Sequence, residues 1–148
     1  MGIIFKAACQ NDIEEIIEMM GIFYKHEQIE LNKNKNINVI KELINNSNFG
    51  NIILICLDGK TIGYLISTFG YSIEYGGKVV LIDEFYIQKE FRNQGIGTEA
   101  LKYVEKKLKA LGIKTIHLQV KNFNPSAKKL YLKNGFQEID RVFMMKIL

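Results

Sequence analysis

Hydrophobic and polar positions in the first part of the chain predict a strand followed by two helices. Residues 2–8 form a short, largely apolar run that is typical of a strand. Asn11 or Asp12 can cap the helix that follows, because apolar residues then recur at helical spacing. The expected buried face of this helix is Ile13, Ile16, Ile17, Met20 and Phe23. The polar stretch 31–38 predicts a loop, and residues 37–46 predict a second short helix.

The next segments change to short, nearly continuous apolar runs, which predict strands. Residues 51–57 and 61–69 flank Asp58-Gly59, a dipeptide that is typical of tight hairpin turns. Residues 78–87 form a further apolar run that carries two carboxylates in its middle. A hairpin followed by another strand is therefore expected.

The last part of the chain alternates helices with strands. A helix is expected from about 95 to 111, ended by Gly112, and its buried residues are Ile96, Leu101, Val104, Leu108 and Leu111. We expect a strand over 114–120, a helix over 125–134, and one or two strands in the tail 136–148. Early hairpins and late crossover helices predict a mixed sheet in an α/β or α+β domain.

Composition limits the class of protein. The chain has 148 residues, 47% hydrophobic and 24% charged, so we expect a single domain over residues 1–148. No apolar run approaches ~18 residues, so neither a transmembrane helix nor a membrane partner is expected. Cys9 and Cys56 give no disulfide framework, and with two histidines they offer no zinc cluster. We therefore expect a cytoplasmic protein without a metal, with both cysteines in the core.

The net charge of +4 is mild. Lysines alternate with apolar residues at helical spacing over 102–114 and 121–133, which is typical of solvated helix faces. A positive rim around an anionic ligand is the alternative. No recognised module accompanies the charge, so a nucleic-acid partner is not expected.

Residues 91–101, FRNQGIGTEAL, raise the question of a nucleotide-binding loop. Gly95, Gly97 and Ala100 fit the G-x-G-x-x-G/A pattern of dinucleotide-binding folds. However, the glycines do not directly follow the strand that ends at Ile87, and the next strand ends without an acidic residue for a ribose. Too little chain then remains for a doubly wound sheet. The pattern alone therefore does not indicate a Rossmann fold.

The same loop leads into a helix N-terminus, which leaves backbone N–H groups unpaired and carries partial positive charge. A pyrophosphate can bind there, and the guanidinium group of Arg92 would add a positive charge beside it. A helix that merely begins with glycines is the alternative that this stretch alone leaves open.

Two motifs together resemble one known family. The first is Arg92-x-x-Gly95-x-Gly97 after an apolar strand. The second, N-x-x-A-x-x-x-Y-x-x-x-G-F, is formed by Asn124, Ala127, Tyr131, Gly135 and Phe136. Both are similar to the acetyl-CoA-binding motifs of the GCN5-related N-acetyltransferases, the GNAT family. The resemblance covers residues 78–137, and the first fifty residues match in layout alone.

The resemblance implies a fold and a cofactor site. The fold is a central, mostly antiparallel sheet with flanking helices, in which the parallel strands 78–87 and 114–120 splay apart. Acetyl-CoA would bind in that wedge, with its pantetheine arm along backbone groups of Phe85, Tyr86 and Ile87. The pyrophosphate would bind to the loop residues Arg92, Asn93, Gln94, Gly95, Ile96, Gly97 and Thr98.

The resemblance also assigns residues of the second motif. Asn124 would contact the cofactor chain, although an N-cap before Pro125 is the other interpretation and the two are compatible. The small Ala127 would leave room for the cofactor. Tyr131, one helical turn later, would protonate the departing CoA thiolate.

Amide formation needs a neutral amine, and deprotonating one at pH 7 costs about 4 to 5 kcal/mol when its pKa is ~10.4. Asp83 and Glu84 are the candidate bases, but neighbours in a strand point to opposite faces unless a bulge intervenes. Family members often place the base nine or eleven positions before the motif arginine, and since Leu81 at eleven cannot act as a base, the resemblance favours Asp83. The alternative is a carboxylate that binds the substrate's cation or a structural partner.

Glu27, Glu30 and Glu74 are expected at the solvated surface.

These observations predict an N-acetyltransferase that moves acetyl from acetyl-CoA to a primary amine of a small cationic molecule or a protein by direct attack. Acetyl-CoA would be a co-substrate, the amine acceptor the other partner, and homodimer formation stays open. The alternative is a non-catalytic protein that binds and senses acyl-CoA.

Overall fold

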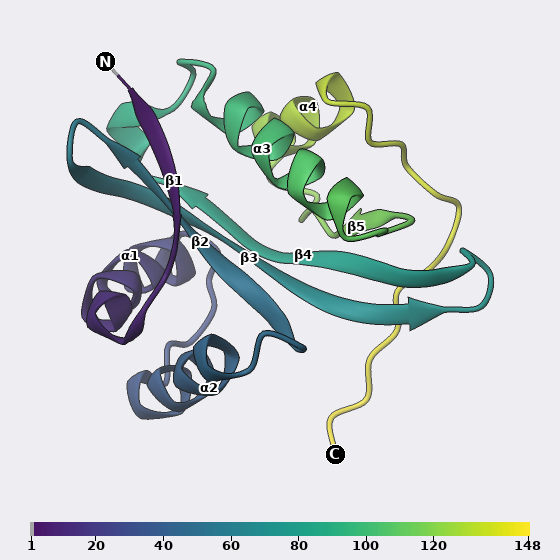
Figure 1. Cartoon of the computed structure of the whole chain (residues 1–148), viewed down its shortest axis with the longest axis horizontal. Coiled ribbons are helices and arrows are strands. Elements are labelled where there is room, and N and C mark those ends of the chain that lie inside the picture. Colours follow the sequence, from purple (N-terminus) through teal and green to yellow (C-terminus); the bar gives the residue numbers. More distant parts are fainter. Residues whose placement is uncertain (1) are drawn as a thin grey trace.

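The computed structural model describes residues 2–148, which form one five-stranded sheet with helices on both faces (Figure 1). The strands are β1 (Ile3–Ala7), β2 (Gly50–Leu57), β3 (Lys60–Ser72), β4 (Gly77–Ile87) and β5 (Ile116–Leu118). They lie in the order β1-β2-β3-β4-β5, and the first four pair antiparallel. β5 joins β4 in parallel, because α3 carries the chain back between them. The predicted mixed sheet is thereby confirmed.

Helices cover each face of the sheet in sequence order. α1 (Ile13–His26) and α2 (Lys33–Asn45) lie on one face, and α3 (Ile96–Ala110) and α4 (Pro125–Lys133) lie on the other (Figure 1). Short 3-10 turns, η1 (Gln10–Asp12) and η2 (Lys89–Phe91), precede α1 and follow β4. Each face has its own core. One includes Ile16, Met20, Leu54 and Tyr64, and the other includes Leu65, Val80, Leu101 and Val104.

The hairpin between β2 and β3 has the predicted tight turn. Leu57 pairs with Lys60, so Asp58 and Gly59 are the two central residues. Their φ angles of 49° and 79° are both positive, as a primed hairpin turn requires.

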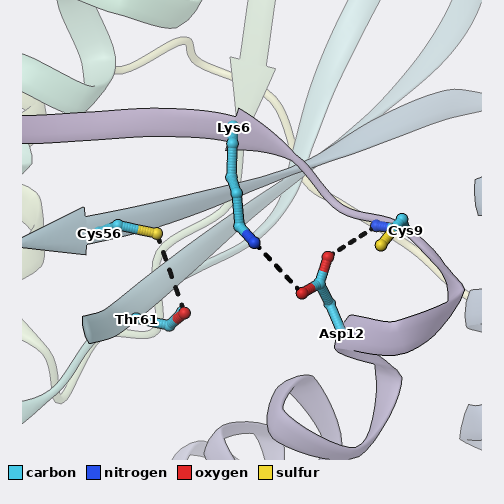
Figure 2. A network of polar contacts seen from close by, with 5 residues as sticks. All are labelled: Lys6, Cys9, Asp12, Cys56 and Thr61. Atoms are coloured by element: carbon cyan, nitrogen blue, oxygen red, sulfur yellow. Dashed lines mark hydrogen bonds and ion pairs between the residues drawn. The ribbon is translucent and has the colours of Figure 1, made fainter. Parts of the chain in front are cut away.

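The start of α1 differs from a simple helix cap (Figure 2). The Asp12 side chain makes no cap hydrogen bond to α1 and instead accepts from the Cys9 backbone N–H at 2.8 Å and Lys6 Nζ at 3.3 Å. Desolvation opposes ionisation of Asp12, but these hydrogen bonds and the Lys6 charge lower its pKa overall. Cys9 is exposed, so the expected core position was wrong for it, whereas Cys56 is buried. Both thiols are free.

Two predicted boundaries and one predicted buried residue were wrong for local reasons. α2 begins at Lys33, within the predicted loop, because Asn32 Oδ1 accepts from the Lys35 backbone N–H at 3.1 Å and caps the helix. β5 keeps three residues of the predicted strand 114–120, since β4 and β5 separate beyond them. Leu111 is 59% exposed because it lies after the last turn of α3, where the buried stripe has ended.

The tail 136–148 contains no strand, which corrects the sequence-based expectation. After α4 it runs past the β3–β4 hairpin and ends on the opposite side of the sheet from α4 (Figure 1). Arg141 donates to both carboxylate oxygens of Glu74 there, at 2.8 and 2.6 Å. Within residues 2–148, no strand of the sheet pairs with the tail. Its apolar side chains are consequently exposed, among them Val142, Phe143 and Met144.

Candidate active site

A β-bulge in β4 brings both candidate carboxylates to the same place. Ile66 of β3 pairs with Glu84, whereas the next residue, Ser67, pairs with Ile82, so Asp83 is the extra residue of β4. A bulge interrupts the alternation of side chains along a strand. Asp83 and Glu84 accordingly line the same two cavities instead of pointing to opposite faces.

The first of these cavities, the wedge cavity, opens where β4 and β5 separate. β5 pairs with residues 80–82 of β4, and no pairing to β5 extends past Ile82 within residues 2–148. The cavity has a volume of about 430 Å³ and is lined by α1, β4, β5, α4 and the connections beside them. It brings together six predicted site residues: Asp83, Glu84, Phe85, Asn124, Ala127 and Tyr131.

Tyr86 and Ile87 are not brought to the wedge cavity by their side chains. The Tyr86 ring is buried at 4% exposure and packs beside Phe23, with ring centroids 5.6 Å apart. The Ile87 side chain packs in the core beside Ile62 and Ile96. A role in cofactor binding through their backbone groups stays a prediction.

The second cavity, the α2 cavity, lies between α1, α2 and the sheet and has a volume of about 490 Å³. Tyr24, Ile29, Asp83 and Glu84 line both cavities, so the two meet at the bulge. Charged side chains also line the α2 cavity: Glu30, Lys35 and Glu42. A molecule bound there would present one end to the two carboxylates.

Glu84 is held by two tyrosines. The Tyr24 hydroxyl donates to Oε2, and the Tyr64 hydroxyl donates to Oε1 at 2.8 Å. Desolvation, with a contribution from the Asp83 charge, raises the pKa of Glu84 overall, although both hydroxyls act in the opposite direction. Burial and the adjacent Glu84 charge raise the pKa of Tyr24 and Tyr64, which keeps both phenols as donors. Both oxygens of Glu84 thus have partners from the protein.

Asp83 has a different environment. Its side chain is exposed to the cavities, and desolvation by the surrounding walls raises its pKa. No hydrogen bond within residues 2–148 compensates. A carboxylate with a raised pKa and free oxygens is suited to accept a proton.

Tyr131 reaches the wedge cavity from α4. Burial raises its pKa to about 12, and the negative charge of Glu27 contributes in the same direction. The phenol is therefore neutral across the physiological range and can donate a hydrogen bond. Its ring packs against Phe136, with centroids 5.6 Å apart, which restricts its orientation.

The loop before α3 forms an open helix N-terminus. Gly95 is the N-cap with φ of 81°, and no side chain caps the helix, so the first N–H groups of α3 are open to a ligand. Arg92 Nε donates to the Ile87 carbonyl at 2.7 Å, and its guanidinium lies over the Tyr86 ring. The side chains of Arg92, Asn93 and Gln94 are exposed.

Three predicted cofactor residues near α3 and α4 have structural roles. Ile96 is buried at 3% exposure, and Thr98 Oγ1 accepts from Asn134 Nδ2 at 3.3 Å. Asn124 Oδ1 accepts from the Ala127 N–H at 3.2 Å and so caps α4. The capping interpretation of Asn124 is confirmed, and its contact with a cofactor stays a prediction.

Glu27 is a cavity residue that the sequence-based interpretation wrongly placed at the surface. It is 8% exposed and lines the wedge cavity beside Tyr131. A signal was present, because Glu27 continues the spacing of Met20 and Phe23 along the buried face of α1. A charge at a core-facing position in this pattern indicates a polar cavity or a partner.

Comparison with known proteins identifies the family. The sequence model of the Acetyltransferase (GNAT) family matches residues 13–136. The chain belongs to this family. Within residues 2–148 of this GNAT member, no group of three or more His, Cys, Asp or Glu side chains is arranged to hold a metal ion. None of its helices in the same range has the length and apolarity to cross a bilayer.

Relatives and solved structures agree with the GNAT assignment. The thialysine N-epsilon-acetyltransferase of Bos taurus is 31% identical over 78 residues, 53% of this chain and 45% of that protein. The chain spans about half the length of the first curated relatives that it matches, 47% and 45%. An integron cassette protein from the Cole Harbour Salt Marsh metagenome superimposes with a TM-score of 0.87 at 26% identity, covering 97% of this chain and 90% of that one.

A predicted acetyltransferase of Clostridium acetobutylicum, solved with acetyl-CoA, superimposes with a TM-score of 0.82 at 18% identity. The match covers 98% of this chain and 96% of that one. At this identity the likeness concerns the fold. The GNAT fold of the chain is thus shared with a protein whose structure includes acetyl-CoA.

Proposed function

We propose that this protein is an acetyl-CoA-dependent N-acetyltransferase that acetylates a primary amine by direct attack. The observation that carries the proposal is the shared wedge cavity. It places a carboxylate with a raised pKa, Asp83, in the same space as the neutral phenol of Tyr131. Direct transfer is helped by a proton acceptor for the amine and a hydrogen-bond donor for the leaving thiolate, and this pair supplies both.

The acyl donor is proposed to enter where β4 and β5 separate. Residues 83–87 of β4 pair with β3, and their other edge is left for an extended ligand such as pantetheine. The open N-terminus of α3 would bind the pyrophosphate, assisted by the exposed Arg92. The predicted acetyltransferase of Clostridium acetobutylicum that was solved with acetyl-CoA supports the choice of acetyl-CoA as the donor.

The chemistry follows from the residues of the cavity. Asp83 accepts a proton from the ammonium form of the acceptor, and the free amine attacks the thioester carbonyl. A backbone N–H near Tyr86 or Ile87 would stabilise the oxyanion. When the tetrahedral intermediate collapses, the thiolate leaves and the nitrogen loses its second proton, which passes to that thiolate.

Tyr131 acts on that leaving thiolate. A thiol has an ordinary pKa of ~8.5, so a phenol of pKa about 12 holds its proton more tightly than the thiolate does. The hydroxyl therefore stabilises the thiolate by donating a hydrogen bond, and complete proton transfer from it is uphill. The thiolate is protonated by the second proton that the nitrogen loses, and the first proton passes from Asp83 to solvent.

The acceptor is proposed to be a small cationic amine in the α2 cavity. Asp83 and Glu84 lie at one end of that cavity, and Glu30 and Glu42 line it further away. This charge favours a cation over an anion. The name of the bovine relative, a thialysine N-epsilon-acetyltransferase, also indicates an amine acceptor for that protein. A protein amine is the broader alternative that the test below includes.

The test is thiol release from acetyl-CoA across a panel of small amines and a lysine peptide. Wild type is compared with Tyr131→Phe, which removes the hydroxyl, and with Tyr71→Phe as a matched control at a residue that is 78% exposed. We expect amine-dependent thiol release, a fall in kcat of about 10-fold or more in Tyr131→Phe, and no change in Tyr71→Phe.

Two results would contradict the proposal in different ways. Acetyl-CoA binding without thiol release from any acceptor would favour an acyl-CoA sensor. Full activity in Tyr131→Phe would remove the donor role of Tyr131 and leave the transferase in place.

A further inference from the structure

The end of the tail, residues 139–148, exposes a strand-like apolar segment. Val142 is 87% exposed and Met144 is 85% exposed, and five more large apolar side chains of the segment are exposed as well: Ile139, Phe143, Met145, Ile147 and Leu148. The unbroken apolar run 142–145 would be apolar on both faces of a strand, as in strands that are covered on both sides. Monomeric proteins rarely expose large contiguous apolar patches, so this segment indicates an interaction surface.

The sheet has an open edge that can accept such a segment. β5 is the last strand of the sheet and pairs with β4 on one side. The Val80 N–H donates to the Thr115 carbonyl at 3.0 Å. Backbone groups alternate in direction along a strand, so those of Ile116 and Leu118 point away from β4. No strand within residues 2–148 lies on that side, and an open edge of this kind is a template for one more strand.

The apolar side chains around β5 are incompletely covered. Ile116 and Leu118 of β5 are half-buried, and so are Leu130 and Phe136, which pack against the same core between α3 and the sheet. Val80 of the neighbouring β4, by contrast, is fully buried. A strand added beside β5 would cover these half-buried side chains and would have its own apolar residues covered in return.

The tail of the same chain does not lie at this edge. It runs past the β3–β4 hairpin and ends on the opposite side of the sheet from α4 (Figure 1). Arg141 holds it at the hairpin, because its guanidinium donates to both carboxylate oxygens of Glu74 immediately before the apolar run. The chain therefore has an apolar strand-like segment and an open edge that suits it, and it does not bring the two together.

We propose that two copies of this chain exchange their tails, so that residues 142–148 of each copy add as a strand to the open edge of β5 in the other. A second copy is the occupant that the edge favours, since each copy offers both the segment and the edge. Reciprocal exchange uses the same contact twice and closes as a two-fold dimer. The Arg141–Glu74 pair stays within each copy and directs the tail outward. The inference concerns assembly and does not depend on the proposed activity.

The first test is the mass of the full chain in solution, measured by size-exclusion chromatography with light scattering. We expect a dimer for wild type and a monomer for Phe143→Asp/Met145→Asp, because charges in the apolar run cannot be buried beside β5. The matched control is Ile4→Asp, which changes an apolar residue that is 60% exposed on β1, at the opposite edge of the sheet, and should stay dimeric. A wild-type monomer would overturn the inference.

Cross-linking shows where the tail binds and needs no variant. Lys146 lies in the tail, and Lys114 and Lys121 lie on either side of β5. Unlabelled chain and chain labelled with heavy nitrogen are unfolded and refolded together, treated with a lysine-reactive cross-linker and analysed by mass spectrometry. We expect links from Lys146 to Lys114 or Lys121 that join an unlabelled peptide to a labelled one.

The remaining outcomes contradict the inference. Links from Lys146 to these lysines that join only peptides of the same isotope would place the tail on the β5 edge of its own chain. A dimer without any link from Lys146 to the lysines beside β5 would use another face of the molecule. Neither readout involves acetyl transfer, so failure of the assembly and failure of the proposed function are seen separately.

Discussion

At the scale of single residues, two adjacent carboxylates differ through their hydrogen bonds. Glu84 is enclosed by the Tyr24 and Tyr64 hydroxyls, which hold it in place. Asp83 is the extra residue of the bulge and faces the cavities without such partners. We infer that Glu84 has a structural role in its hydrogen bonds with the two tyrosines and that Asp83 is the proton acceptor.

The replacement Asp83→Asn tests this division. Because a base must be ionised, the wild-type rate should fall as the pH drops through the raised pKa of Asp83. Asp83→Asn should lower kcat by about 10²- to 10⁴-fold and remove this acidic limb. The measurement is a pH profile of kcat/KM, with Glu84→Gln as the isosteric comparison. Loss of the limb in Glu84→Gln instead would exchange the two roles.

The same replacement should not destabilise the fold. A raised pKa means that the folded state binds the proton more tightly than the unfolded chain does. Ionisation of Asp83 therefore reduces stability above its folded-state pKa, and this penalty is absent below the unfolded value of 3.8. Thermal melts of Asp83→Asn at neutral pH should show equal or greater stability than wild type. A fall in stability would indicate a structural role for the charge.

Some site residues could be inferred from the sequence and others could not. Tyr131 and Asn124 belong to a spaced motif that marks their positions. The shared orientation of Asp83 and Glu84 depends on a bulge, which is set by pairing with β3 and leaves no mark in β4 itself. Glu27 was missed because a charged residue near a helix end is usually solvated.

At the scale of elements, α3 and α4 meet at a glycine. A Cβ atom added at Gly97 would lie 3.0 Å from Leu130 Cδ2, closer than a normal contact. Gly95, two residues earlier, has open space around it and a φ of 81°. The two glycines of the motif thus serve different needs: Gly95 allows a left-handed turn, and Gly97 allows two helices to approach.

Replacing each glycine separates these needs. Gly97→Ala should lower the free energy of unfolding by about 1 to 3 kcal/mol, because the new methyl group overpacks the contact with Leu130. Its effect should shrink in a Leu130→Ala background, as a double-mutant cycle measured by denaturant unfolding would show. Gly95→Ala is the control, since its backbone strain does not involve Leu130. An additive cycle for Gly97 would mean that the contact is not limiting.

Periodicity predicted most elements because each one buries a stripe or a face of its own. The hairpin β2–β3 and the helices α1 and α3 follow their apolar patterns closely. The tail 136–148 has a strand-like composition, yet strands require a partner edge, and its partner cannot be read from its own residues. The start of α2 depended on the Asn32 cap, which resembled one more loop asparagine.

At the scale of the whole molecule, the C-terminal part is weakly buried. Residues 109–148 include no fully buried side chain, and α4 contains none. This part supplies Asn124, Ala127 and Tyr131 to the wedge cavity. Few buried contacts imply low local stability, so a ligand in the wedge would order this region most.

Hydrogen exchange should show this effect directly. Acetyl-CoA at about a hundredfold over its Kd should add roughly 2.7 kcal/mol to global stability. The largest local slowing of amide exchange is expected in α4 and in residues 119–124, while β2 in the core changes little. Mass spectrometry with and without acetyl-CoA provides the measurement. Protection confined to α1 and α2 would place the cofactor elsewhere.

The two cavities take their walls from different parts of the chain. Apart from β3 and β4, the α2 cavity is lined by residues 20–49, whereas the distal wall of the wedge cavity comes from residues 118–131. Substitutions at positions that line the α2 cavity alone, such as Val39 and Leu43, can therefore alter which amine is accepted without changing a residue of the wedge cavity. The family motifs of this chain lie in the loop before α3 and in residues 124–136, so they mark the proposed donor side and carry little information about the amine.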